Sequence, residues 1–240
     1  MPTSCARTDI GRRRKSNQDY LYTSDEQIGK LPNLYIVADG MGGHNAGDFA
    51  SRFTVDQMTE LIRRSEQESI PSVFDEALHI INLKLRRIAA QDERYYGMGT
   101  TLVGATVLDD TLYVANIGDS RLYVLKDRLT QITIDHSLVE EMVLSGTLDQ
   151  KKARTHPDRN IITRAIGAED WLEVDFFSEK VEQGELVLMC SDGLTNMLED
   201  AEIESVLRDE RPLAEKCDRL VDWANERGGR DNISVVIIRL

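Results

Sequence analysis

Each of four apolar stretches in this sequence has an aspartate at one end, with glycine close beside it. The stretches read VADGMGGH (37–44), VANIGDSR (114–121), VLMCSDGL (187–194) and GGRDNISVVII (228–238). The aspartates are Asp39, Asp119, Asp192 and Asp231. A single Asp-Gly pair is most often a turn, because both residues tolerate the backbone angles of tight turns. Four such aspartates at the ends of apolar stretches instead indicate a shared site.

Carboxylates that converge in one place favour a bound divalent cation. Like charges brought together in a partly desolvated site cost several kcal/mol unless a cation lies between them. Ligand sets made only of oxygen select hard ions such as Mg²⁺ or Mn²⁺ over zinc. The neighbouring glycines let the backbone approach closely, and a glycine carbonyl can itself be a ligand. We therefore expect a magnesium or manganese site at the strand ends.

A basic run lies near the N-terminus, in GRRRKSNQDYL (11–21). For Arg12 and Arg13 the simplest interpretation is a solvated charge. Arg14 directly precedes Lys15-Ser16-Asn17, and a guanidinium near a metal–carboxylate cluster can grip a phosphate through two parallel hydrogen bonds while the metal polarises it. The aspartates and this run together indicate phosphate chemistry.

The elements that must position these residues follow from hydrophobic periodicity. Strands are expected at Leu34–Ala38, Thr101–Leu108, Leu112–Ile117, Arg121–Leu125, Leu172–Lys180, Leu186–Cys190 and Ile233–Arg239. Helices are expected at 46–64, from Ser72 to Ile88 after Pro71, at 200–208 and at 212–227. We interpret the strands within 101–125 as an antiparallel meander. Strands in runs, with two helices early and two late, favour an α+β layered fold over a doubly wound parallel sheet.

Length, charge and cysteine content narrow the class of protein. The 240 residues contain no linker or repeat, and we interpret 1–240 as a single domain. The formal net charge of −13 argues against a nucleic-acid partner or a broad contact with an anionic membrane. Cys5, Cys190 and Cys217 form no metal-binding pair, and Cys190 is interpreted as a core residue. Without a signal region or a long apolar run, we expect no membrane insertion and a cytoplasmic location.

The motifs taken together resemble those of a known family. They are RKSNQD, VADGMGGH, MGTT (98–101), NIGDSR (116–121), CSDGL (190–194) and GGRDN (228–232). From about residue 7 to the C-terminus, their order and spacing are similar to the metal-dependent protein serine/threonine phosphatases of the protein phosphatase 2C type, in the compact bacterial form. The resemblance implies a four-layer α-β-β-α sandwich, in which helices flank two antiparallel sheets and a metal centre lies at one edge.

The resemblance also implies the metal ligands. Asp39 is expected to bridge two tightly bound ions, Mn²⁺ or Mg²⁺, with the Gly40 carbonyl contributing to the second. Asp192 and Asp231 match the ligands that complete the first ion. Asp119 matches the ligand of a third, weaker ion, to which Asp192 contributes.

Four more residues receive roles from the same resemblance. Arg14 matches the arginine that binds the substrate phosphate, and His44 matches a histidine proposed as general acid. Asp19 matches an acidic residue that holds metal-bound water in the outer shell, and Asn232 is expected to orient nearby ligands. Gly42-Gly43 would then allow the tight path that brings His44 back to the site.

Two points stay open on the residues alone. Asp119 could bond its own turn or pair with Arg121, since Asx-turns are frequent. His136 and His156 lie in or near the polar, irregular segment 136–170, which the resemblance equates with a mobile flap beside the active site. We interpret both histidines as surface or loop residues.

The function implied by the resemblance is hydrolysis of phosphoserine and phosphothreonine in proteins. A metal-activated water would attack the phosphorus in line, with no phospho-enzyme intermediate. The expected partners are phosphoproteins, including a cognate bacterial serine/threonine kinase and its substrates, and a monomer is expected. The alternative is a non-catalytic regulator of the same fold that binds phosphoproteins. Loss of a metal aspartate would indicate that alternative, and none is lost in this sequence.

Overall fold

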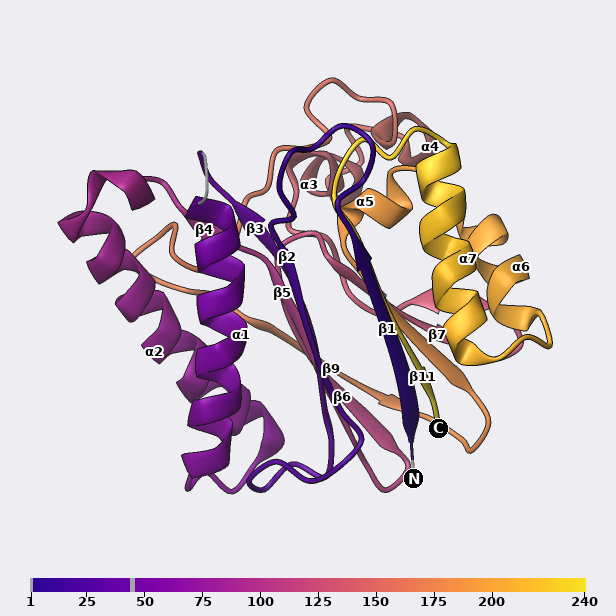
Figure 1. The fold of residues 1–240 in the computed structure, drawn as a ribbon, viewed down its shortest axis with the longest axis horizontal. Coiled ribbons are helices and arrows are strands. Elements are labelled where there is room, and N and C mark those ends of the chain that lie inside the picture. Colours follow the sequence, from indigo (N-terminus) through magenta and orange to yellow (C-terminus); the bar gives the residue numbers. More distant parts are fainter. Residues whose placement is uncertain (1, 44–45) are drawn as a thin grey trace.

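Two antiparallel sheets packed face to face form the centre of the molecule (Figure 1). The computed structural model describes residues 2–43 and 46–240. One sheet has the spatial order β1 (Thr3–Asp9), β11 (Ile233–Arg239), β10 (Leu186–Cys190), β7 (Arg121–Leu125) and β8 (Leu129–Gln131). The other has the order β2 (Asp19–Ser24), β3 (Leu34–Met41), β5 (Leu102–Leu108), β6 (Thr111–Ile117) and β9 (Asp175–Lys180), and the short β4 (Gly99–Thr100) pairs with β3.

Helices cover the outer face of each sheet, as Figure 1 shows. Helices α1 (Ala46–Arg64) and α2 (Ile70–Gln91) lie on the sheet that contains β3. Helices α6 (Asp200–Arg208) and α7 (Leu213–Glu226) lie on the sheet that contains β11, and the short α5 (Asp192–Thr195) follows β10. This arrangement confirms the predicted α+β, four-layer α-β-β-α sandwich. Among the described residues, no helix has both the length and the apolar character needed to cross a membrane.

The strand prediction for Leu34–Ala38 is confirmed, and burial explains its unbroken apolar sequence. Leu34, Ile36 and Ala38 point into the core beneath α1 and α2. Tyr35 and Val37 point the other way, into the core between the two sheets. Because successive side chains of a strand alternate between its faces, a strand buried on both faces is apolar at every position.

The predicted three-stranded meander within 101–125 is wrong in its last strand. Strand β5 pairs with β6, but the other neighbour of β6 is β9. Strand β7 pairs instead with β10 in the opposite sheet. The chain crosses between the sheets at Gly118, whose φ of +100° favours glycine, and a Cβ there would press on the side chain of Thr101.

Several boundaries and elements differ from the sequence prediction. Helix α2 begins two residues earlier than expected, because the Ser69 hydroxyl accepts a hydrogen bond from the N–H of Ser72 at 3.2 Å and caps the helix. Strand β9 begins at Asp175 instead of Leu172. Strands β1, β2, β4 and β8 were not predicted; β1 is a largely exposed edge strand without an apolar run, and its pairing with β11 defines it.

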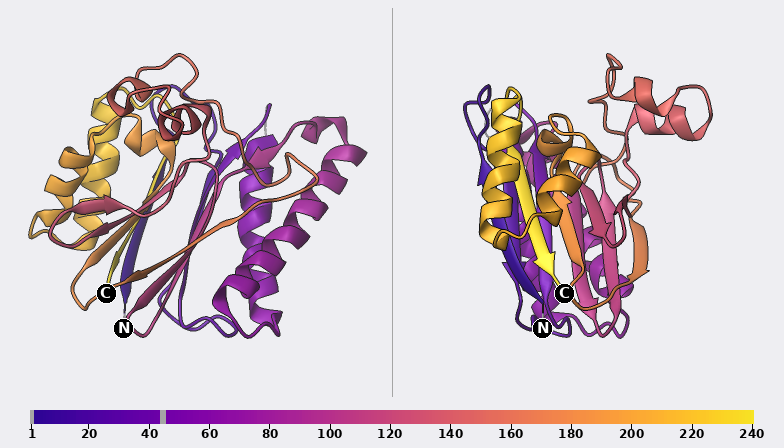
Figure 2. Two further views of the ribbon diagram at one scale, coloured as in Figure 1. Left: turned by 180° about the vertical axis from the view of Figure 1, so that it is seen from behind. Right: turned by 90° about the vertical axis from the view of Figure 1, so that its right-hand side faces the viewer.

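The segment 136–170 projects from the sandwich, as the right-hand view of Figure 2 shows. It contains the short helices α3 (Leu138–Leu144) and α4 (Gln150–Ala153). Ser137 caps α3, because its hydroxyl accepts a hydrogen bond from the N–H of Glu140 at 3.3 Å. His136 lies in a loop as predicted, but it is only 5% exposed and is therefore not a surface residue.

A buried asparagine joins the start of β3 to β5 and yields a stability prediction. The Asn33 side chain donates to the Val107 carbonyl at 2.9 Å and accepts from the Val107 N–H at 2.8 Å. Asn33→Ala leaves both buried backbone groups unpaired, so we expect a loss of about 2 kcal/mol in the free energy of unfolding, measured by urea titration. The control Thr111→Val, which removes a hydroxyl bonded to the exposed side chains of Asp110 and Lys180, should change it by less than about 0.5 kcal/mol. Equal effects would contradict the prediction.

Candidate active site

Five acidic side chains come together at the end of the sandwich where strands of both sheets meet the loops drawn at the top of Figure 1. Asp19 begins β2 and lies directly opposite Asp39 of β3 in the strand register. Asp192 follows β10, Asp231 precedes β11 and Asp119 follows β6. The charges of the other four carboxylates all act on Asp39. The structure therefore gathers the four aspartates singled out at strand ends together with Asp19, which the family resemblance had also placed at the site.

Burial makes these carboxylates costly to ionise together. The pKa of Asp39 is raised well above its usual range, first by burial and then by the charges of Asp19 and Asp192. Burial and the charge of Asp192 likewise raise the pKa of Asp119. Burial is also the main cause that raises the pKa of Asp19 to about 7 and that of Asp192 to about 6. Protons or a cation must offset this charge.

Three of the carboxylates each have one oxygen without a partner. Oδ2 of Asp19 accepts from the Ser191 hydroxyl at 2.7 Å, and Oδ2 of Asp192 accepts from the Asn196 amide at 2.9 Å. The Oδ1 atoms of Asp19, Asp119 and Asp192 are buried and have no hydrogen-bond partner within residues 2–43 and 46–240. Buried acceptors left unpaired cost free energy. A hard cation would satisfy them, so the oxygen donors fit Mg²⁺ or Mn²⁺.

Asp231 differs because its carboxylate is paired with an arginine. Nη2 of Arg14 donates to Oδ2 of Asp231 at 2.6 Å, and this hydrogen bond raises the pKa of the half-exposed guanidinium. Oδ1 of Asp231 accepts from the N–H of Asn232 at 2.8 Å. Within the described part of the chain, no three His, Cys, Asp or Glu side chains are already arranged to hold a metal ion.

The Asn232 side chain holds the loop that carries Arg14. Its Nδ2 donates to the carbonyl oxygens of Ile10 and Ser16, at 2.9 and 3.0 Å. Its Oδ1 accepts from the N–H of Gln18 at 2.8 Å. The Asn232 side chain is therefore hydrogen-bonded to the backbone on both sides of Arg14. His44, the remaining predicted site residue, lies outside the described residues.

Two threonines to which no role was predicted from the sequence hold the backbone of Asp39. The N–H of Asp39 donates to Oγ1 of Thr101 at 3.0 Å. The Asp39 carbonyl accepts from the N–H of Thr101 and from the Thr100 hydroxyl, both at 2.9 Å. Both threonines belong to the MGTT motif, which could have indicated from the sequence that they take part in the site. The next residue, Gly40, has no room for a side chain, because a Cβ would clash with the Gly47 carbonyl oxygen.

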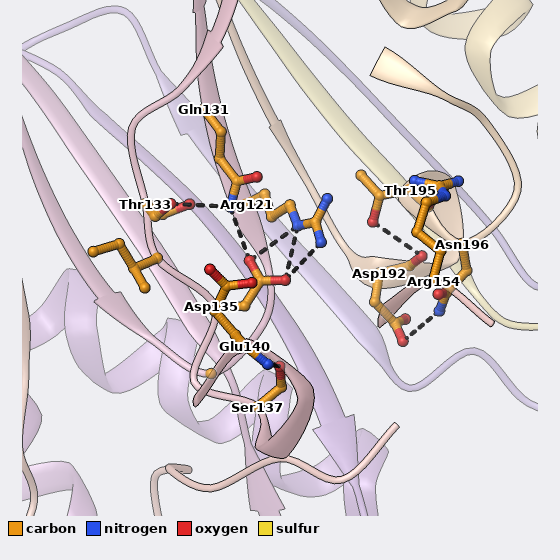
Figure 3. A network of polar contacts seen from close by, with 12 residues as sticks. Arg121, Gln131, Thr133, Asp135, Ser137, Glu140, Arg154, Asp192, Thr195 and Asn196 are labelled. Carbon is orange, nitrogen blue, oxygen red and sulfur yellow. Dashed lines mark hydrogen bonds and ion pairs between the residues drawn. The ribbon is translucent and has the colours of Figure 1, made fainter. Parts of the chain in front are cut away.

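A second polar network lies beside Asp192 (Figure 3). Arg121 donates to both carboxylate oxygens of Asp135, at 2.7 to 3.0 Å. Arg121 is thus bonded to Asp135 and not to Asp119, the partner that the sequence left open. A small cavity of about 70 Å³ is lined by Asp119, Asp192 and this ion pair. It lies next to the carboxylates and faces the segment 136–170.

Comparison with known proteins identifies the family of the chain. Residues 10–236 match the family described as protein phosphatase 2C. The chain belongs to the protein phosphatase 2C family. It is similar to the protein phosphatase PhpP of Streptococcus pneumoniae, with 39% identity over 237 residues that cover 97% of this chain and 95% of PhpP.

Solved structures agree with this membership of the protein phosphatase 2C family. The serine/threonine phosphatase Stp1 from Staphylococcus aureus has a TM-score of 0.93 and 33% identity, over 100% of this chain and 95% of Stp1. The catalytic domain of the phosphatase PstP in complex with two manganese ions has a TM-score of 0.87 and 31% identity, over 99% and 97% of the two chains. The protein is a bacterial protein serine/threonine phosphatase of a metal-dependent family.

The raised pKa values of the phosphatase yield a stability prediction. A carboxyl such as Asp19, whose pKa rises from 3.8 to about 7 on folding, binds more protons in the folded than in the unfolded chain between these values. Its contribution to stability therefore falls as the pH rises through this window. Mn²⁺ needs ionised carboxylates, so it should raise the Tm more at about pH 8 than at about pH 6. Scanning calorimetry with Mn²⁺ or a chelator measures this; an equal rise at both pH values would count against a carboxylate metal site.

Proposed function

We propose that this phosphatase hydrolyses phosphoserine and phosphothreonine in proteins with the help of two tightly bound Mn²⁺ or Mg²⁺ ions. The proposed ligands are Asp39, the Gly40 carbonyl, Asp192 and Asp231, with Asp119 and Asp192 sharing a third, weaker ion. The observation that carries the proposal is the convergence of buried carboxylates with unpartnered oxygens. The two manganese ions in the related PstP structure support the number of tight sites.

The residues of the chain have separate tasks in this reaction. When bound, the ions supply a water of lowered pKa and offset charge on the phosphoryl group. Asp19 is held by Ser191 and keeps one oxygen free to orient that water. His44 is proposed to give a proton to the departing serine or threonine oxygen, which leaves poorly as an alkoxide.

Arg14 is proposed to bind the substrate phosphate. Its guanidinium is half exposed, and it lies where the charges of Asp39 and Asp192 still act on it. A planar guanidinium can offer two parallel N–H groups to a phosphoryl group. In the structure one of these groups bonds Asp231, so substrate phosphate and this carboxylate would compete for Arg14.

The wider setting is also part of the proposal. The similarity to PhpP and Stp1, both named as protein phosphatases, supports a phosphatase that opposes a bacterial serine/threonine kinase and acts on its substrates. We take the chain as one catalytic domain and a monomer, with the projecting segment 136–170 as a flap that contacts substrates. The three free cysteines Cys5, Cys190 and Cys217 support a cytoplasmic location.

Replacing Asp39 tests the metal centre. Asp39→Asn removes a charge from the ligand that is proposed to bridge both ions, so turnover of a phosphothreonine peptide should fall at least ~100-fold, with loss of tight Mn²⁺ binding by calorimetry. Asp192→Asn and Asp231→Asn should behave alike. Asp56→Asn on the exposed side of α1 removes the same charge and should leave both unchanged. Near wild-type turnover of Asp39→Asn at saturating Mn²⁺ would refute the bridging role.

Replacing Arg14 separates phosphate binding from metal binding. Arg14→Ala should keep Mn²⁺ affinity while the KM for a phosphopeptide rises about 10-fold, more than kcat falls, because a charge-assisted contact to the phosphate is lost. Arg14→Lys should restore little, since an ammonium lacks the planar fork. Steady-state kinetics of Arg12→Ala and Arg13→Ala provide the matched controls. The same KM rise in all three alanine variants would show only a diffuse basic patch.

A further inference from the structure

A buried histidine lies between the Asp119 turn and the projecting segment. His136 is 5% exposed and directly precedes Ser137, the N-cap of α3. Its backbone N–H donates to the Gly118 carbonyl at 2.9 Å. Its ring Nδ1 lies 3.0 Å from the backbone nitrogen of Gly118. His136 therefore bonds both polar backbone groups of the residue that precedes Asp119.

These contacts determine which ring nitrogen carries the proton. The Gly118 amide can only donate, so Nδ1 of His136 must accept, and the proton of the neutral ring lies on Nε2. Nε2 is 3.1 Å from Oδ2 of Asp175, to which it donates. Arg164 Nη1 also lies 3.3 Å from Nε2, but both groups are donors there, and Arg164 bonds Oδ1 of Asp175 at 2.9 Å instead.

The same histidine also joins both ends of the projecting segment. The N–H of Thr163 donates to the His136 carbonyl at 2.9 Å, so the outgoing chain is bonded where the segment begins. Arg164 then reaches Asp175 and Glu173, at 2.9 and 3.2 Å. His136 thus has one side on the Asp119 turn and the other on the base of the segment.

We propose that His136 is a positioning residue that fixes Asp119 through Nδ1 and anchors the segment 136–170 through Nε2. The inference rests on the proposed role of Asp119 as a metal ligand. The Asp119 side chain is buried and its Oδ1 has no partner among the described residues, so the position of its carboxylate depends on the backbone of the turn. Thr101 also packs against the turn, because its side chain fills the space beside Gly118.

Two conservative substitutions separate the two contacts. In His136→Asn the amide oxygen takes the place of Nδ1 and can still accept from Gly118, but the bond to Asp175 is lost. In His136→Gln the amide nitrogen takes the place of Nε2 and can still donate to Asp175, but the acceptor for Gly118 is lost. His156→Asn is the matched control, because His156 lies within the segment and the hydrogen bond and ion pair of its ring go to its near neighbour Asp158.

Exchange of the Gly118 amide with solvent, measured by NMR on the metal-free chain, is the first readout. His136→Gln should exchange at least ~10-fold faster than wild type, while His136→Asn and His156→Asn should remain protected. Equal exchange in the Asn and Gln variants would overturn the assignment of Nδ1. This readout involves no metal, so it stands even if Asp119 proves not to be a ligand.

Metal binding and kinetics form the second readout. In calorimetric titration with Mn²⁺, His136→Gln should weaken only the weakest binding event, by about 10-fold, and lower kcat on a phosphothreonine peptide. His136→Asn should keep that event, raise the peptide KM and leave the KM for para-nitrophenyl phosphate unchanged. If His136→Asn does not melt cooperatively, Asp175→Ala removes the same bond from its other partner and should raise the peptide KM in the same way. Equal changes on both substrates in every variant would reduce His136 to a framework residue. Absence of a weak event in the wild type would instead refute the role of Asp119.

Discussion

The concentration of negative charge at one buried place is the constraint on which the rest of the structure depends. Five carboxylates act on one another there, and burial raises the pKa of four of them. Protons or a bound cation must offset this charge, and a cation can do so only if rigid neighbours hold each carboxylate in place. The Ser191 hydroxyl holds one of these carboxylates. It donates to Asp19 and accepts from the N–H of Ser234, and so connects the ends of β10, β11 and β2.

The two-sheet architecture follows from the same requirement. One sheet alone would present its strand ends along a row, whereas two sheets packed face to face bring ends from both into one cluster. Asp19 and Asp39 come from the sheet that contains β3, while Asp192 and Asp231 adjoin the sheet that contains β11. The crossing of the chain at Gly118 adds Asp119 to this cluster, and so the break in the expected meander belongs to the site.

The sequence predicts those helices and strands that carry a clear apolar pattern within their own residues. Strands β3, β10 and β11 each contain a nearly continuous apolar run, and α1 has apolar residues at helical spacing, so their positions follow from pattern alone. Strand β1 is polar and becomes a strand only through its partner β11, a pairing of distant segments that no local pattern reveals. The aspartates were predicted from their repeated placement at strand ends. The pairing of Arg14 with Asp231 and the burial of His136 depend on contacts across the fold and were not predictable.

The pairing of β1 with β11 determines when the active site can form during synthesis and folding of the chain. Arg14 follows β1 and Asp231 precedes β11, so 217 residues separate two groups that touch. Of the strands in these two sheets, β11 is synthesised last, and until then β1 lacks its partner in the sheet. Contacts between the two ends of a chain close slowly, because the loop entropy must be overcome first. The acidic centre is therefore completed only after β11 has been synthesised, so a nascent chain that lacks β11 has no finished hydrolytic site.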